Sequence, residues 1–334
     1  MATLGRHLFD VFKYFHCKTL LFMIYSRKIY IGGKTAMKQA TPIFKGAGIA
    51  LITPFKEDGS VDYERLGQLI DYQIDNSTDA IIICGTTGEA STLSTEEHLS
   101  VIKFAVKHTN NRIPVIAGTG SNDTIFAANL SSKAEKYGAD GVLLVTPYYN
   151  KTTQEGLVKH FDYIASRISI PIILYNIPSR TGLNIEIPTM KKLAKIPNVV
   201  AVKEASGNIS YCAKLIHECG EMLDVYSGND DMITPIMSLG GVGVISVLSH
   251  IVPLETHNMV MNCINNNFRK ATQMQITYLD LINTLFCEVN PIPVKEALNL
   301  MGFNVGICRL PLCQMTAEHH VMLQNVLWRH GLIK

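Results

Sequence analysis

Short apolar runs that alternate with helical segments are the feature of this sequence that most constrains its fold. From Gly46 onward, runs rich in Val, Ile, Leu and Ala recur at regular intervals, and such runs predict strands buried on both faces of a sheet. The expected strands are Gly48–Thr53, Ala80–Gly85, Pro114–Gly118, Gly141–Thr146, Pro171–Tyr175, Val199–Lys203, Asp224–Ser227 and Val242–Ser246. Between them lie segments with apolar residues at helical spacing, such as Tyr63–Ile74, Glu96–His108, Thr124–Tyr137 and Gln154–Ile168.

Eight strand–helix units within about 200 residues predict an α/β fold, a closed parallel TIM (β/α)8 barrel with its helices outside. An open doubly wound sheet is the alternative. No Gly-x-Gly-x-x-Gly opens the first unit, however, and that motif marks the dinucleotide-binding form of such sheets.

The chain is expected to divide into three parts. After Ser249 the strand pattern stops, and Leu254 to about Phe286, Pro293–Met301 and a last stretch ending near Trp328 look helical. We therefore expect a barrel over residues 42–250 and a small C-terminal helical bundle over residues 251–334. Residues 1–41 are expected to lie outside the fold, either as a targeting segment or as residues upstream of a true start at Met37. The second interpretation is favoured, because a compact pattern begins soon after Met37.

Composition excludes several classes of function. Residues 1–41 hold seven Lys or Arg and one Asp, so the other residues hold 23 basic and 27 acidic side chains, a charge of −4. A mildly acidic globular part argues against a nucleic-acid partner. The apolar run Leu20–Tyr25 is too short to span a membrane. The eight cysteines show no C-x-x-C pair and no zinc spacing, which predicts no metal site, free thiols and a reducing compartment, the cytoplasm.

A lysine at the end of an expected strand is the first chemical signal. Lys203 closes the run Val199–Lys203, and in a barrel of this kind the chemistry lies at the carboxyl ends of the strands. Burial lowers the pKa of an ammonium group, which turns lysine into an amine nucleophile for carbonyl compounds. The alternative is a lysine that has reached the wet rim of the barrel, or one paired with Glu204.

Other expected strand ends carry polar groups that suit such a lysine. Two hydroxyls, Thr86 and Thr87, lie between glycines after the second strand, where they suit a carboxylate or serve as a helix-capping turn. Tyr175 ends the fifth strand, and Arg180 follows it with a guanidinium suited to bidentate binding of a carboxylate. Together they predict a Schiff-base site with anion-binding groups and a phenol that carries protons.

Five motifs, in order, resemble the dihydrodipicolinate synthase family, also called 4-hydroxy-tetrahydrodipicolinate synthases. The resemblance runs from about Ile43 to the C-terminus and includes none of residues 1–41. The motifs are Gly85-Thr-Thr-Gly-Glu89, Tyr148-Tyr-Asn150, Tyr175-Asn-Ile-Pro-Ser-Arg-Thr-Gly182, Val202-Lys-Glu-Ala-Ser-Gly207 and Asn290-Pro-Ile-Pro-Val-Lys295.

The resemblance implies roles for individual residues in a synthase of lysine biosynthesis. Lys203 matches the lysine that forms a Schiff base with pyruvate, and Tyr175 matches the tyrosine that relays protons. Thr87 and Tyr149 match its partners in the relay, which is completed across a subunit interface. Thr86 lies with Thr87 in the loop that holds the carboxylate of pyruvate.

The second substrate and the assembly are also implied by the resemblance. Arg180 matches the residue that binds the carboxylate of L-aspartate 4-semialdehyde, and Ile245 matches a backbone contact to the keto acid. Gly228 is expected to line the substrate site through its backbone. The resemblance implies a homotetramer, a dimer of dimers, and no cofactor beyond the covalent adduct with pyruvate.

Two alternative functions stay open. A sister enzyme with the same lysine and tyrosine, such as N-acetylneuraminate lyase or a keto-sugar-acid aldolase, is one. Thr87 and Arg180 argue against it, because the lyases resemble Gly-Ser-Thr-Gly and usually lack that arginine. The other is a catalytically idle binding protein on the same scaffold, which the presence of Lys203, Tyr175 and Arg180 disfavours.

The sequence departs from the family's lysine-inhibited members at the allosteric site. His98, Asn122 and Tyr148 match the residues of that site, but Thr95 replaces a histidine and Phe126 replaces an acidic residue. Losing a carboxylate that pairs with the amino group of an effector removes a charge-assisted contact. We therefore expect weak or absent feedback inhibition by lysine.

Overall fold

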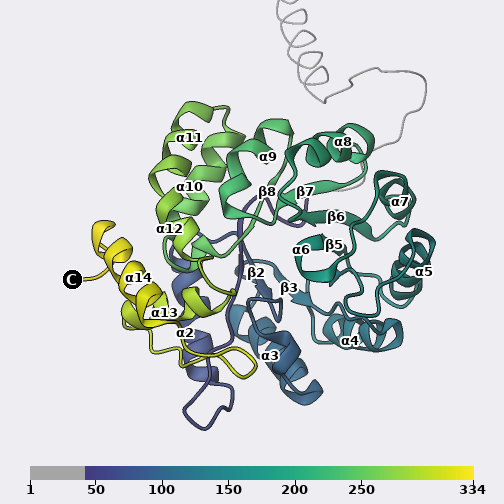
Figure 1. Ribbon diagram of the computed structural model, residues 1–334. Coiled ribbons are helices and arrows are strands. Elements are labelled where there is room, and N and C mark those ends of the chain that lie inside the picture. The colour runs from purple at the N-terminus through teal and green to yellow at the C-terminus, as the bar shows by residue number, and fades with distance from the viewer. Residues whose placement is uncertain (1–41) are drawn as a thin grey trace, which may run out of the picture. The chain divides into compact units, whose positions relative to one another are not determined.

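The strands form the closed barrel that the sequence predicts. The computed structural model describes residues 42–334, which lie within one compact unit, Lys38–Lys334. Eight strands pair in parallel in chain order, and β1 closes the barrel against β8 (Figure 1). The strands are β1 Gly46–Ala50, β2 Ala80–Ile83, β3 Val115–Gly118, β4 Gly141–Val145, β5 Ile172–Asn176, β6 Val199–Glu204, β7 Asp224–Ser227 and β8 Gly243–Ser246.

Helices surround the barrel, and short polar side chains cap the first turns of several of them. The helices before the C-terminal group are α2 Tyr63–Asp75, α3 Thr95–Thr109, α4 Thr124–Lys136, α5 Gln154–Ala165, α6 Pro178–Thr181, α7 Ile187–Leu193, α8 Ile209–Cys219 and α9 Ile233–Leu239. Asp62, Asp123 and Asn208 each accept a hydrogen bond from an amide in the first turn of the helix that follows. Ser94 and Glu97 form a reciprocal capping box at α3, so both satisfy amides that the helix leaves unpaired.

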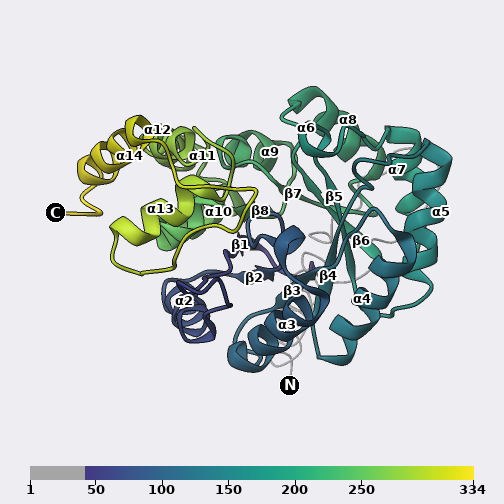
Figure 2. The same ribbon diagram turned by 60° about the horizontal axis from the view of Figure 1, so that its bottom comes forward.

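The C-terminal helices gather at one side of the barrel, as the two views in Figures 1 and 2 show. They are α10 Pro253–Ile264, α11 Phe268–Thr277, α12 Leu279–Thr284, α13 Ile292–Leu300 and α14 Ala317–Arg329. The expected helical stretch from Leu254 to Phe286 is therefore divided into three helices. The first break falls at three asparagines, where Asn266 adopts a positive φ of 61°. The expected division of the fold at residue 250 stays a prediction, as does the expectation for residues 1–41, which fall outside the described residues.

Strand β1 begins and ends earlier than the sequence predicts. It starts at Gly46, whose φ is 122° and where a Cβ would lie 2.0 Å from a carboxylate oxygen of Asp79. It ends at Ala50 because the Ile52 amide leaves the ladder and donates to Nε2 of His250 at 3.1 Å. Glycine is thus required at the start, since other residues rarely adopt this conformation.

Two apolar cores lie on the two sides of the strands. The larger one packs the outer strand faces against the helices. The smaller one fills the barrel interior and includes Ala201 from β6, Ala205 directly after it, Tyr226 from β7 and Phe44, which precedes β1. The Phe44 ring stacks on that of Tyr226 at 4.4 Å between centroids, and the Tyr226 hydroxyl donates to the Phe44 carbonyl at 2.7 Å. These two rings close the interior on the side where the strands begin.

No helix within residues 42–334 is long and apolar enough to cross a membrane.

Candidate active site

Lys203 projects into the barrel interior because of the alternation along β6. Successive side chains of a strand point to opposite faces, and Ala201 and Ala205 both belong to the interior core, so Lys203 between them faces inward. Only 6% of Lys203 is exposed. Register places it beside Tyr175 on β5, and its Nζ lies 4.4 Å from the centroid of the Tyr175 ring.

This environment favours the neutral amine of Lys203. Burial lowers its pKa to about 8, the positive charge of Arg180 acts in the same direction, and the charge of Asp230 opposes them. The alternative pairing with Glu204 does not occur. Glu204 faces the opposite side of β6, where its carboxylate accepts hydrogen bonds from Nδ2 of Asn176 at 2.8 Å and from the Ser206 amide at 2.6 Å.

Tyr175 is held as a neutral phenol beside a threonine hydroxyl. Burial raises its pKa to about 12, while Arg180 and a hydrogen bond with Thr86 oppose this shift. The described structure therefore pairs the phenol with Thr86. Thr87, which the sequence interpretation paired with Tyr175, makes a different contact.

Thr87 is buried, and a residue near the start of helix α13 forms a hydrogen bond with its side chain. Its hydroxyl accepts a hydrogen bond from Nδ2 of Asn290 at 2.8 Å. The backbone carbonyl of Asn290 also accepts a hydrogen bond from Nη2 of Arg180 at 3.2 Å. One residue thus links two of the predicted substrate-binding side chains.

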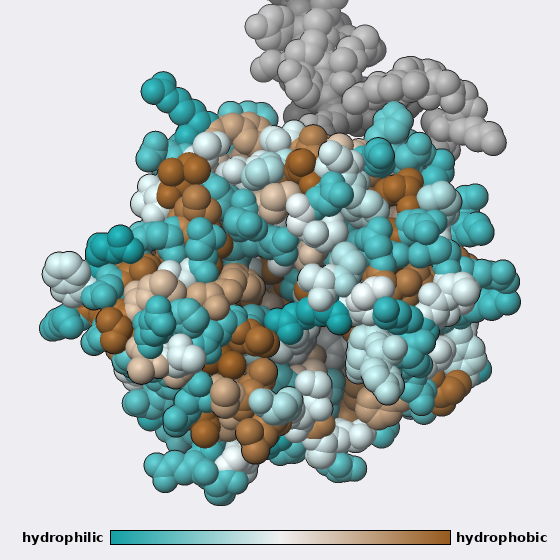
Figure 3. All heavy atoms as spheres, viewed as in Figure 1, coloured by the Kyte–Doolittle hydropathy of each residue, from teal (hydrophilic) through white to brown (hydrophobic). Residues whose placement is uncertain are grey.

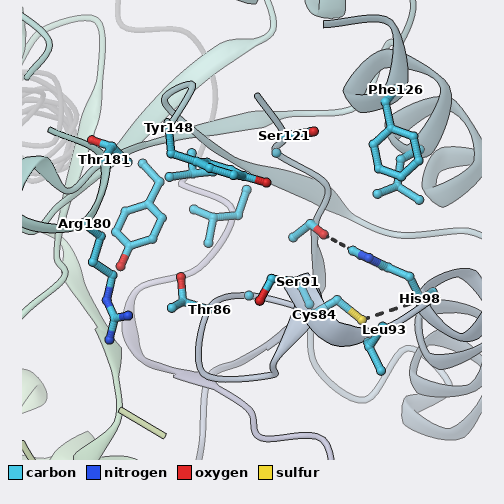
Figure 4. Close-up of a pocket in the computed structure, with 18 of the residues that line it drawn as sticks. Cys84, Thr86, Ser91, Leu93, His98, Ser121, Phe126, Tyr148, Arg180 and Thr181 are labelled. Carbon is cyan, nitrogen blue, oxygen red and sulfur yellow. Dashed lines mark hydrogen bonds between the residues drawn. The ribbon is translucent and has the colours of Figure 1, made fainter. Parts of the chain in front are cut away.

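A pocket of about 390 Å³ opens above these groups. The face of the molecule in Figure 3 is hollowed near its centre. Figure 4 shows Thr86 and Arg180 at one end of the pocket and His98 and Phe126 at the other, with Tyr148 between them. Lys203 does not line this pocket directly, and its ammonium lies against the ring of Tyr175, which does.

Gly228 and Ile245 lie at the ends of the two strands that follow β6. The Gly228 amide donates to the carbonyl of Glu204 at 2.7 Å, and a Cβ on Gly228 would lie 2.6 Å from that of Ala205. No larger residue fits here without a shift of the backbone. Ile245 lies on β8 with its side chain in the interior core.

Tyr149 lies apart from the other predicted site residues. It is 93% exposed, adopts a positive φ of 67° and lines neither described pocket. Of the residues expected to form the relay, Tyr175 lines the pocket, Thr87 is bound to Asn290, and Tyr149 lies apart from both.

The predicted allosteric residues are divided between two pockets. His98, Tyr148, Thr95 and Phe126 line the pocket of about 390 Å³, whereas Asn122 lines a second one of about 350 Å³. His98 is buried, burial lowers its pKa, and its Nε2 lies 2.8 Å from the Gly118 carbonyl oxygen.

Sequence reasoning assigned no role to Asp230 or Asn290. Asp230 is buried just after β7, where its Oδ2 accepts hydrogen bonds from the amides of Val247 and Leu248 at 3.0 and 2.9 Å. Burial raises its pKa, and the charge of Lys203 opposes the shift. A carboxylate directly after a barrel strand was the available signal for Asp230, and the motif Asn290–Lys295 was the signal for Asn290.

No group of three or more His, Cys, Asp or Glu side chains suited to a metal ion occurs in the part of the chain that the structure describes.

Comparison with known proteins identifies the family. Residues 43–329 match the Dihydrodipicolinate synthetase family. A 4-hydroxy-tetrahydrodipicolinate synthase of Caldicellulosiruptor bescii is 57% identical over 290 residues, which cover 87% of this chain and 98% of that protein.

Two solved structures are similar over nearly their whole length. The dihydrodipicolinate synthase of Aquifex aeolicus is 48% identical with a TM-score of 0.85, covering 86% of this chain and 99% of that one. The chloride-inhibited dihydrodipicolinate synthase of Acinetobacter baumannii, solved in complex with pyruvate, is 43% identical with a TM-score of 0.85 and the same coverage. The chain belongs to the dihydrodipicolinate synthetase family.

Proposed function

We propose that this chain is a 4-hydroxy-tetrahydrodipicolinate synthase, which condenses pyruvate with L-aspartate 4-semialdehyde on Lys203. The observation that carries the proposal is a lysine buried inside the barrel, with its pKa lowered to about 8, against the ring of a neutral tyrosine. The Acinetobacter baumannii relative was solved in complex with pyruvate, a ketone that such an amine can attack. The name of the Caldicellulosiruptor bescii relative supports the complete reaction.

The first half of the reaction forms an enamine. The neutral amine of Lys203 attacks the ketone carbon of pyruvate, and the oxygen leaves as water to give an iminium ion. The iminium is an electron sink, so a proton leaves the methyl group and an enamine forms. Tyr175, with the Thr86 hydroxyl beside it, is the proposed carrier of these protons. This chemistry requires no metal and no nucleotide.

The second half forms the carbon–carbon bond and releases the lysine. The enamine carbon attacks the aldehyde carbon of the semialdehyde, whose oxygen takes a proton and becomes a hydroxyl. The amino group of the semialdehyde then attacks the imine carbon, the ring closes, and the Lys203 amine leaves. Arg180 is proposed to bind the carboxylate of this second substrate, because its guanidinium lies at the same end of the pocket as Thr86 (Figure 4).

The remaining predicted residues keep their roles as proposals. Thr87 and the surrounding loop bind the pyruvate carboxylate, and backbone groups of Gly228 and Ile245 line the keto-acid site. Tyr149 joins the relay from a second copy of the chain, since its side chain is 93% exposed and lines neither described pocket. The proposed assembly is a homotetramer, with a barrel over residues 42–250, helices over residues 251–334, and action in the cytoplasm.

An assay with two substrate sets tests the proposed function. With pyruvate and L-aspartate 4-semialdehyde, a coupled reductase assay should report steady turnover, and N-acetylneuraminate should release no pyruvate. Release of pyruvate from N-acetylneuraminate without turnover of the semialdehyde would make the protein a sister lyase. Absence of both activities in folded protein would favour a binding function.

A further inference from the structure

A buried ion pair joins the loop after β2 to helix α13. Nζ of Lys295 lies 2.6 Å from Oε1 of Glu89, and the side chains are 2% and 1% exposed. Glu89 ends the loop Gly85–Glu89, which carries Thr86 and Thr87, and Lys295 is the fourth residue of α13. The proposed reaction uses neither charge.

The surroundings of the pair fix both partners. Oε2 of Glu89 accepts a hydrogen bond from the Arg309 amide at 2.9 Å, and Lys295 donates to the Ile307 carbonyl at 3.1 Å. Nζ of Lys295 and the guanidinium carbon of Arg309 lie 4.2 and 4.3 Å from the centroid of the Phe55 ring. The two charged side chains are therefore contacted by the C-terminal segment and by Phe55 in the loop after β1.

The same helix contacts the loop at a second point. Asn290, just before α13, donates from Nδ2 to the Thr87 hydroxyl at 2.8 Å. Within the loop, the Gly88 carbonyl accepts a hydrogen bond from the Thr53 hydroxyl at 2.7 Å, and Glu89 adopts a left-handed φ of 53°. A non-glycine residue keeps this conformation only where its surroundings enforce it.

Stability alone is a poor explanation for this arrangement. The desolvation of two buried charges offsets most of their attraction, so apolar residues in such positions are often at least as stable. What the ion pair adds is a fixed position for one end of a loop whose hydroxyls must meet a substrate within fractions of an ångström.

We propose that Glu89 and Lys295 are positioning residues for pyruvate, which hold Thr86 and Thr87 in place from the C-terminal helices. This inference rests on the proposed function and assigns a role to two residues outside the reacting groups. It predicts that the C-terminal helices are required for affinity toward the first substrate, in addition to any role in assembly.

The test compares steady-state kinetics of variants at this pair. Glu89→Gln with Lys295→Met removes both charges and leaves no buried ion unpaired. We expect the KM for pyruvate to rise roughly tenfold or more, with a much smaller change in the KM for the semialdehyde. Trapping of Lys203 by borohydride should need a correspondingly higher pyruvate concentration.

Two further variants keep the inference open to refutation. Glu296→Gln is the matched control, because Glu296 is the neighbour of Lys295 in the sequence but its carboxylate pairs with His320 at 2.8 Å and does not touch the loop. The KM of this variant for pyruvate should equal that of the wild type. Phe55→Leu keeps both charges and removes only the ring against them, and it should raise the pyruvate KM by a smaller factor. If the double variant does not fold, the KM of Phe55→Leu for pyruvate tests the positioning role, and a wild-type value would contradict it.

The outcomes separate this inference from the proposed function. A folded double variant with the wild-type KM for pyruvate would overturn the positioning role, as would an equal rise in both KM values, which indicates a general loss of structure. If the wild-type protein itself shows no trapping by pyruvate, the proposed function fails instead.

Discussion

The two ends of the barrel are built on different principles. Where the strands begin, Phe44 and Tyr226 fill the interior with stacked rings, and the Asp79 carboxylate binds both the Ala47 amide and His257 at 2.7 Å. Where the strands end, Lys203 and Tyr175 are buried with pKa values shifted against their charged forms. The first end is arranged for packing, and at the second the lowered pKa of Lys203 raises the fraction of its neutral amine above the fraction found in water.

Two buried oxygen atoms near Lys203 and Thr87 have no hydrogen-bond partner. Among the described residues, Oδ1 of Asp230 and Oδ1 of Asn290 are buried without a hydrogen-bond partner, and both lie near the strand ends. Unsatisfied buried acceptors destabilise a fold, so their retention beside Lys203 and Thr87 fits a site arranged for a ligand. Substitutions at the two ends should therefore separate stability from catalysis.

The largest expected effect is at Lys203. Lys203→Met removes the nucleophile, so kcat/KM should fall by about 10⁴-fold or more. The melting temperature should stay the same or rise, because a buried charge is replaced by an apolar side chain of similar length. If the purified Lys203→Met variant kept more than a hundredth of the wild-type kcat/KM, Lys203 would not be the nucleophile.

The opposite result is expected at the beginning of the strands. Phe44→Ala deletes a buried ring and leaves a cavity, so the free energy of unfolding should fall by about 3–5 kcal/mol. KM values for both substrates should not change. Urea unfolding and steady-state assays measure these quantities, and Ile276→Ala, at a side chain that is 60% exposed, serves as the control within about 0.5 kcal/mol. A large rise in the KM of Phe44→Ala for either substrate would show that this end of the barrel also affects substrate binding, and would contradict the comparison.

Two substitutions should shift the pH profile in opposite directions. In the wild type, kcat/KM for pyruvate should rise as pH increases through about 8, where Lys203 becomes neutral. Asp230 raises the pKa of Lys203, so Asp230→Asn should move this acidic limb to lower pH. Arg180 lowers that pKa, so Arg180→Met should move the limb to higher pH, and by less, because Arg180 is exposed to solvent. Shifts of the same sign would contradict the assigned charges.

The smallest expected effect is inhibition by lysine. The resemblance implies that Phe126 takes the place of an acidic residue of lysine-inhibited members, so we expect lysine to bind this protein about tenfold or more weakly than it binds them. Phe126→Glu should restore part of the inhibition, with Ile125→Glu on the neighbouring exposed position as the control. Strong inhibition of the wild type at low millimolar lysine would contradict this expectation.

The barrel and its central residues were predictable for physical reasons. Buried parallel strands require continuous apolar runs, and the chain supplies eight of them. Their carboxyl ends meet at one face, so Lys203, Tyr175, Thr86 and Arg180 were expected together, and the structure brings them together. Alternation along β6 then decides between two adjacent residues, placing Lys203 inside and Glu204 outside.

Other features depend on contacts between distant parts of the chain. The choice of Thr86 rather than Thr87 as the partner of Tyr175 follows from the loop conformation and from Asn290, which is far away in sequence. The Glu89–Lys295 pair joins two motifs whose separation along the chain gives no sign of contact. Asp230 acquires its environment from amides after β8. Local patterns do not contain this information.

Trapping with borohydride tests the central claim most directly. Incubation of the wild-type protein with pyruvate and borohydride should reduce the iminium to a stable secondary amine and inactivate the protein. The peptide that contains Lys203 should then gain the mass of a 1-carboxyethyl group in place of one hydrogen. Lys203→Met should gain no such mass. Full activity after treatment, or a label on another lysine, would contradict a Schiff base on Lys203.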